Sequence, residues 1–154
     1  MSFPSSARRS SGFTFIELML IVTLIGVLVA ISLPYYGDYR NRVKTMQSAH
    51  EIVGIEALIE TYRISHPQLP DTLDEMKVPG TVDPWGRPYE FYNIEVHGKG
   101  HARKDHALNP LNTDYDLYSL GPDGVTKPQI THRDSLDDVI RASDGGYVGV
   151  ASGF

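Results

Sequence analysis

The sequence predicts an α+β protein in which a long N-terminal helix packs on a small antiparallel sheet. Three observations favour this fold class. An apolar run from Phe13 to Leu33 contains one charged residue, Glu17. An amphipathic pattern then continues to residue 66, and two later segments are rich in aromatic and branched residues. With 154 residues, the chain has room for one small core beside the apolar run.

The apolar stretch, residues 13–34, is predicted to be a membrane-spanning helix. It matches the roughly 20 residues that a helix needs to cross the hydrocarbon core of a bilayer. Residues 1–12 are polar, basic and rich in serine, and they end at Gly12 directly before the run. A conventional signal peptide is cut at small residues after its apolar stretch, whereas Pro34 is followed here by two tyrosines. Any cleavage is therefore expected before the helix, after a leader of residues 1–12.

Residues 35–66 are predicted to continue the helix as an amphipathic second half. Apolar residues recur there at spacings of three and four among charged neighbours, as in a helix that packs one face on a core. Gly26 and Pro34 bracket the expected place for a kink, because glycine lowers helix propensity and proline removes a backbone donor. His66-Pro67 is expected to end the helix. The predicted packing face consists of Tyr39, Val43, Met46, Ala49, Ile52, Ile55, Ile59 and Tyr62.

Residues 67–154 are predicted to form a small globular, β-rich part that begins with turns. Asp71 is a candidate cap for a short helix over Leu73–Met76. Asp83-Pro84-Trp85-Gly86 suits a type I turn, with Asp first, Pro second and Gly fourth. Trp85 is expected to anchor the core rather than to line a binding site.

Two strands are predicted, over Tyr89–Val96 and Tyr115–Leu120. The loop between them, residues 97–112, is polar and locally basic, with His97, His101, His106, Lys99, Arg103 and Lys104. Because its glycines disfavour a helix that would align the imidazoles, we expect a solvated loop rather than a metal site or a docking surface. The tail from Gly121 onward reads as turns, with one short apolar element at Val139-Ile140.

Composition limits the possible functions. The net charge of −5 disfavours binding to nucleic acid through the overall electrostatic field of the protein. The absence of cysteine excludes disulfides and thiolate metal sites, so a small exported domain would need another staple. The chain also lacks a phosphate-binding glycine loop and a His-Glu metal motif, and nothing in it favours an enzyme tethered by one helix.

The segment Gly12-Phe13-Thr14-Phe15-Ile16-Glu17, followed by the apolar run and by Pro34, resembles the leader junction of type IV pilins and of the pseudopilins of type II secretion. This resemblance implies that a prepilin peptidase cuts between Gly12 and Phe13, and that the new amino group of Phe13 is methylated. It also implies that Glu17 pairs with the amino terminus of a neighbouring subunit in a filament. A carboxylate at membrane depth is costly unless it is paired, and the cut would create its partner. The alternative is that Glu17 simply reaches headgroup water.

Three downstream pieces narrow the resemblance to the major pseudopilins of type II secretion. In order, they are the segments 83–89 (DPWGRPY), 116–124 (DLYSLGPDG) and 137–140 (DDVI). The resemblance implies a single-pass protein of the bacterial inner membrane, with its soluble part in the periplasm, that polymerises into a pseudopilus. It implies as partners further copies of itself, minor pseudopilins, the prepilin peptidase, and the inner-membrane assembly platform with its secretion ATPase. The alternatives are a surface pilin of the type IV class and a monomeric, calcium-binding membrane protein. The missing cysteines count modestly against the surface pilin.

The same resemblance implies a calcium ion in the C-terminal loops, since calcium prefers six to eight oxygen ligands. The matched side-chain ligands are Asp123, Asp137 and Asp138, and the matched backbone ligands are the carbonyls of Leu120 and Val125. The spacing is not that of an EF-hand, so only the resemblance makes this site specific. The segment 126–136 is longer than the family pattern and an expected later tryptophan is missing, which leaves Asp134 or Ser135 as alternative ligands.

Overall fold

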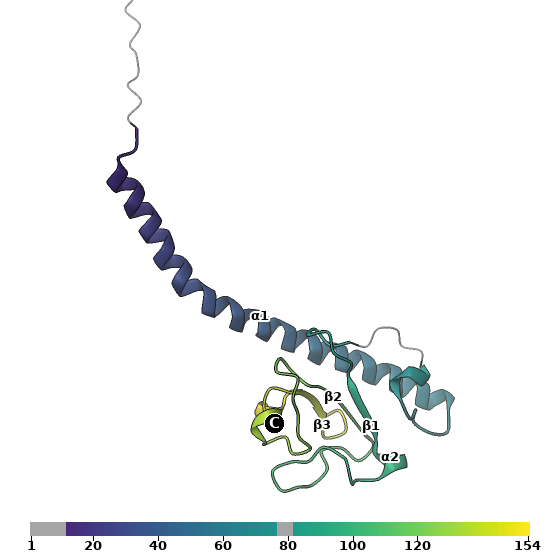
Figure 1. The fold of residues 1–154 in the computed structure, drawn as a ribbon. Coiled ribbons are helices and arrows are strands. Elements are labelled where there is room, and N and C mark those ends of the chain that lie inside the picture. Colours follow the sequence, from purple (N-terminus) through teal and green to yellow (C-terminus); the bar gives the residue numbers. More distant parts are fainter. Residues whose placement is uncertain (1–11, 77–81) are drawn as a thin grey trace, which may run out of the picture. The chain divides into compact units, whose positions relative to one another are not determined.

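The long helix predicted from the sequence is the first element of the fold (Figure 1). The computed structural model describes residues 12–76 and 82–154. Helix α1, Phe15–Ser65, runs without interruption past Pro34 and ends directly before His66-Pro67, as predicted. The chain divides into two compact units between Tyr39 and Arg40, and each is described separately.

The first unit contains the apolar part of α1. Its large apolar side chains are solvent-exposed in the isolated subunit, from Phe13 at 75% exposure to Leu33 at 66%. Among the described residues, α1 is the one helix long and apolar enough to cross a membrane. This surface therefore needs lipid or other protein around it, because an uninterrupted apolar face of this length is unstable in water.

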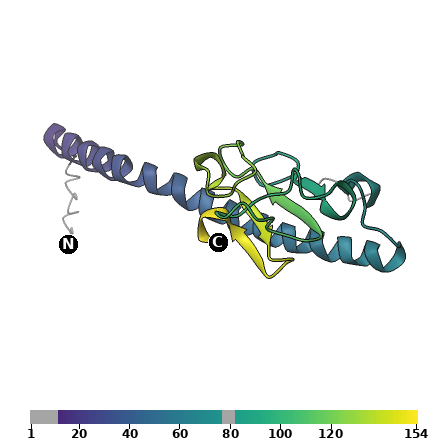
Figure 2. The same cartoon turned by 90° about the horizontal axis from the view of Figure 1, so that it is seen from below.

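The second unit contains a four-stranded antiparallel sheet packed on the later part of α1 (Figures 1 and 2). The strands follow one another in space as they do in sequence, each pairing with the next. Tyr118 of the second strand faces Ile140 of the third, which in turn faces Gly149 of the fourth. The strands are β1 Glu90–Asn93, β2 Tyr115–Ser119, β3 Val139–Ala142 and β4 Tyr147–Val150.

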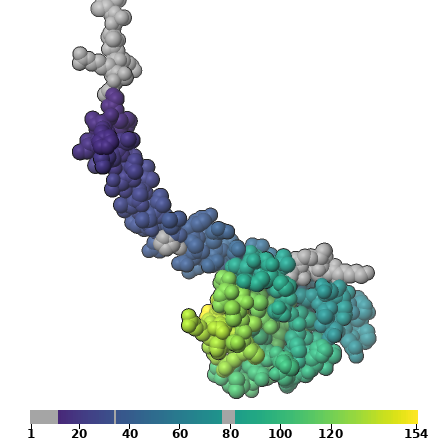
Figure 3. Space-filling model, viewed as in Figure 1, coloured from purple at the N-terminus to yellow at the C-terminus, as the bar shows by residue number. Residues whose placement is uncertain are grey.

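Short helices connect and flank these strands, and the chain from residue 82 to residue 154 fills one continuous body in the space-filling view (Figure 3). The predicted helix over Leu73–Met76 is present as a single 3-10 turn. The carboxylate of Asp71, its expected cap, instead contacts His97, with Asp71 Oδ1 2.5 Å from His97 Nε2. The remaining short helices are α2 Ile94–His97, η2 Arg133–Ser135 and η3 Ala151–Gly153.

The core lies between α1 and the sheet. Ile52, Ile55 and Ile59 of α1 pack against a cluster that includes Tyr115, Leu117 and Val139. Trp85 packs at the edge of this cluster, as predicted, and Lys44 lies over its ring. The predicted packing face is wrong at Tyr39, Val43 and Met46, which are exposed because the buried part of the helix starts only at Ser48.

The strand predictions need two corrections. Residues 94–96 were expected in a strand but are helical, because the side chain of Asn93 accepts the N–H of Val96 and caps α2. The tail was expected to hold one short apolar element, but β3 is joined by β4. A tight turn with Ser143 and Asp144 at positive φ lets the chain reverse there.

Candidate functional sites

The N-terminal junction is held by a reciprocal pair of contacts at the start of α1. The N–H of Glu17 donates to the Thr14 hydroxyl at 3.3 Å, and the N–H of Thr14 lies 3.5 Å from Glu17 Oε2. This is the arrangement of a capping box, which satisfies backbone donors at a helix start. The carboxylate of Glu17 therefore points back along its own chain, toward the residue that follows Phe13. A negative charge at this end of a helix is also favoured by the helix dipole.

Of the predicted leader, residues 1–12, all but Gly12 lie outside the described residues. Cleavage after Gly12, methylation of Phe13 and the pairing of Glu17 with a neighbouring subunit all stay predictions.

The three downstream pieces interlock in space. Asp83 is completely buried, and its Oδ2 accepts a 2.6 Å hydrogen bond from the Ser119 hydroxyl. Its Oδ1 accepts the amides of Trp85 and Arg87, which fixes the predicted turn, and Gly86 N–H closes that turn on the Asp83 carbonyl at 2.8 Å. The Arg87 guanidinium then donates to the carbonyl of Gly121.

The residues predicted to bind calcium fall into two groups. Asp123 and Asp137 lie on facing loops, with the amide of Asp123 3.3 Å from Asp137 Oδ2. The carbonyl of Leu120 accepts Gly124 N–H, and Asp123 Oδ1 accepts Val125 N–H at 2.8 Å. These oxygens suit a hard cation, which takes carboxylate and carbonyl ligands.

Asp138 belongs to the other group. Its side chain is fully buried, and its Oδ2 lies 2.7 Å from Arg103 Nη2 and 2.5 Å from the Thr126 hydroxyl. Burial raises the pKa of this carboxyl, against the effect of Thr126 and Arg103. Within residues 12–76 and 82–154 there is no group of three or more His, Asp or Glu side chains placed to hold a metal ion. The calcium site stays a prediction.

The alternative ligands are held in other contacts. The Ser135 hydroxyl is buried and exchanges hydrogen bonds with the backbone of Lys127. The Oδ2 atom of Asp134 lies 3.7 Å from His132 Nδ1.

Residues 7–33 match the family model described as the prokaryotic N-terminal methylation motif. The chain is 25% identical over 145 residues to the type II secretion system core protein G of Pectobacterium carotovorum, covering 80% of this chain and 83% of that protein. It is 27% identical over 140 residues to the same protein of Pseudomonas aeruginosa, covering 76% and 87%. The resemblance to major pseudopilins is confirmed.

Fimbrial proteins match over less of the chain. The fimbrial protein of Neisseria meningitidis is 30% identical over 84 residues, which is 54% of this chain and 49% of that protein. None of the solved structures matches. The extent of the match therefore separates the secretion proteins from the fimbrial ones.

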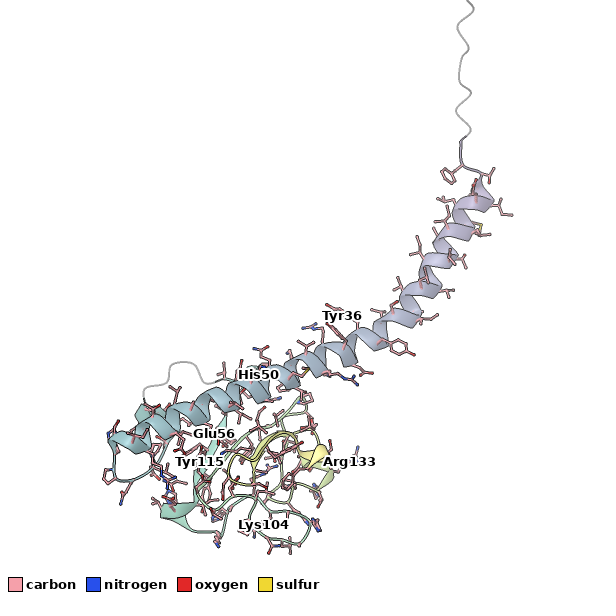
Figure 4. All side chains as sticks on the ribbon, turned by 180° about the vertical axis from the view of Figure 1, so that it is seen from behind. Tyr36, His50, Glu56, Lys104, Tyr115 and Arg133 are labelled. Atoms are coloured by element: carbon pink, nitrogen blue, oxygen red, sulfur yellow. The ribbon has the colours of Figure 1, made fainter. Side chains whose placement is uncertain are left out.

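Two buried arginines, Arg103 and Arg141, were not predicted from the sequence. Arg141 on β3 donates to Glu56 of α1 at 2.8 Å and to both carboxylate oxygens of Asp114 at 2.8 and 2.9 Å. Its guanidinium also stacks over the ring of Tyr115, 4.0 Å from the ring centroid. Figure 4 labels Glu56 and Tyr115 where α1 meets the sheet. Arg103, expected in a solvated loop, has a side chain only 4% exposed.

Proposed function

We propose that the chain is a structural subunit of a type II secretion pseudopilus. The observation that carries this proposal is the match to core protein G over about four fifths of the chain, joined to the N-terminal methylation motif. The subunit would be inserted in the bacterial inner membrane through α1, with its globular part in the periplasm. Polymerisation would then drive protein export across the outer membrane.

Assembly follows from what the isolated subunit leaves exposed. The apolar part of α1 is covered by lipid in the membrane and would be covered by other copies in a filament. Cleavage after Gly12 would create an ammonium on Phe13, and Glu17 of a neighbouring copy would neutralise it. Such a pair fixes axial register because both charges would otherwise stay unpaired in an apolar surrounding.

The proposed partners follow from the same assignment. They are the prepilin peptidase, the minor pseudopilins, and the assembly platform with its secretion ATPase. The role is structural rather than enzymatic.

Calcium is part of the proposal. Asp123 and Asp137, with the carbonyls of Leu120 and Val125, would supply the ligand oxygens, while Asp138 would stay bound to Arg103. The ion would neutralise carboxylates that otherwise repel each other across the loops. A ligand present at a hundredfold excess over its Kd stabilises the fold by about 2.7 kcal/mol.

Melting of the full chain in detergent, with calcium and with chelator, tests the ion. Calcium should raise Tm by several degrees in wild type and in Asp105→Ala, but not in Asp123→Ala. Asp105 is the matched control because its carboxylate caps only its own turn, through Ala107 and Asn109. Identical wild-type curves would remove calcium from the proposal.

Deleting the gene from its bacterium tests the export function. Secreted enzymes should then accumulate in the periplasm, and the full chain should restore their release, whereas the count of sheared surface fibres should not change. Normal export with loss of surface fibres would instead support the second candidate, a type IV pilin, which the fimbrial matches favour.

A further inference from the structure

The central loop, residues 97–112, delivers one arginine into the interior of the C-terminal loops. Arg103 Nη2 donates to Asp138 Oδ2 at 2.7 Å, and the two side chains are 4% and 0% exposed. Arg103 Nη1 donates to the Thr126 hydroxyl, which itself contacts Asp138 Oδ2. One guanidinium therefore touches both ends of the segment 126–138.

Further contacts fix Arg103 in this position, although its Nε is buried without a hydrogen-bond partner. Its own amide donates to Asp116 Oδ2 at 2.6 Å, and its guanidinium lies over the ring of Tyr118, 4.3 Å from the ring centroid. The backbone of the next residue, Lys104, is hydrogen-bonded to the segment 126–138. Its N–H donates to the Pro128 carbonyl, and its own carbonyl accepts the N–H of Ile130. The central loop and the segment 126–138 are thus joined by backbone hydrogen bonds at Lys104 and by the buried ion pair between Arg103 and Asp138.

The positive charge of this contact is permanent. A guanidinium cannot lose its proton in a protein, and a bonded guanidinium–carboxylate pair is among the strongest polar contacts. Removing one member of a buried pair leaves an uncompensated charge, which is costly. An internal cation therefore occupies Asp138 Oδ2, the same carboxylate that the resemblance assigns to a metal.

We propose that Arg103 is the counter-cation of Asp138 and keeps the segment 126–138 ordered without a metal ion. Calcium then acts on the loop of residues 120–125, through Asp123 and Asp137. This division builds on the proposed calcium site, but the part that concerns Arg103 does not require the ion to bind.

Hydrogen exchange of the full chain in detergent, read by mass spectrometry with calcium and with chelator, tests the proposal. In chelator, peptides of 126–138 should stay protected in wild type and exchange at least about tenfold faster in Arg103→Met. The melting temperature of this variant should fall by on the order of 10 °C. Arg133→Met is the matched control, because Arg133 lies in the same segment but is exposed (Figure 4). Its replacement should leave the exchange rate and the melting temperature unchanged.

A second variant separates charge from packing over Tyr118. Combining Arg103→Met with Asp138→Asn removes the uncompensated charge and should recover much of the protection that the single change loses. A double variant as fast as Arg103→Met would show that Arg103 acts by packing and would overturn the counter-cation role.

Two further results would also overturn the proposal. One is wild-type protection of 126–138 that collapses in chelator, since the segment would then depend on the metal. The other is unchanged exchange in Arg103→Met. Failure of the calcium site would look different, because wild type and Arg103→Met would both ignore the ion while still differing from each other in chelator.

Discussion

Two buried arginines, Arg103 and Arg141, link parts of the globular unit that are distant in sequence. Arg141 joins α1 to the sheet through Glu56 and to the loop before β2 through Asp114. Its side chain is 2% exposed, so both partners lose their counter-charge together if it is removed. Desolvation lowers the pKa of Arg141, but its hydrogen bonds to Asp114 and Glu56 outweigh that effect and raise it.

Arg141→Met should therefore destabilise the folded chain by about 3 kcal/mol, because two carboxylates stay partly buried without a partner. Thermal unfolding of the full chain in detergent measures this. Arg63→Met is the matched control, since Arg63 pairs with Glu95 on the surface, where side chains are 47% and 43% exposed. That pair should contribute less than about 1 kcal/mol. Equal losses in the two variants would contradict the stapling role.

Asp144 gives a prediction about acid. Burial raises the pKa of this carboxyl, but hydrogen bonds from the amide and hydroxyl of Thr113, at 2.7 and 2.8 Å, lower it below the usual 3.8. A depressed pKa contributes stability above the unfolded value and loses it as the pH falls through the folded value. Asp144→Asn should thus be less stable than wild type near neutral pH, and the two melting temperatures should converge below pH 3.8. A constant difference down to strong acid would rule this contribution out.

At the scale of elements, two glycines let the predicted pieces meet. Gly121 has φ of 64°, and a Cβ there would collide with the carbonyl of Asp137. Gly86 has φ of 89° but no atom near the place of its Cβ. Gly121→Ala should cost both backbone strain and a displaced loop, roughly 3 kcal/mol, and Gly86→Ala only the strain of about 1 kcal/mol. Equal melting temperatures for Gly121→Ala and Gly86→Ala would show that the loops can move apart at Gly121 without a further loss of stability.

The sequence predicts those elements whose cause is local. The helix to residue 65, the turn after Asp83 and the strand at Tyr115 each follow from periodicity, turn chemistry or branched residues. The end of β1 at Asn93 was missed because one side-chain cap overrides strand propensity. Arg103 was missed for a different reason: its partner Asp138 is distant in sequence, and no local pattern distinguishes it from Lys104. Buried ion pairs depend on tertiary contacts that periodicity does not encode.

At the scale of the whole molecule, the two units differ in how far their apolar side chains are buried. Almost every described apolar side chain before Pro34 is exposed in the subunit, while the globular unit has its own core and its own ion pairs. The filament contact is therefore expected at the N-terminal junction, where Glu17 is the one charge in the apolar run. The capping box gives Glu17 a second role, within its own chain.

Two substitutions of Glu17 separate these roles. Glutamine at this position can keep the capping box, since Glu and Gln both serve there, but it cannot neutralise a neighbour's ammonium. If charge pairing drives assembly, Glu17→Gln and Glu17→Leu should both be inserted and processed normally, and both should fail to form filaments when expressed alone. Thr14→Ala breaks the hydroxyl half of the cap, keeps the charge, and should assemble. Crosslinking in membranes detects filaments as a ladder of multimers. Identifying the N-terminal residue of the product shows whether the chain was processed. Filaments from Glu17→Gln at the wild-type rate would assign Glu17 to the cap and leave axial register to the apolar face of α1.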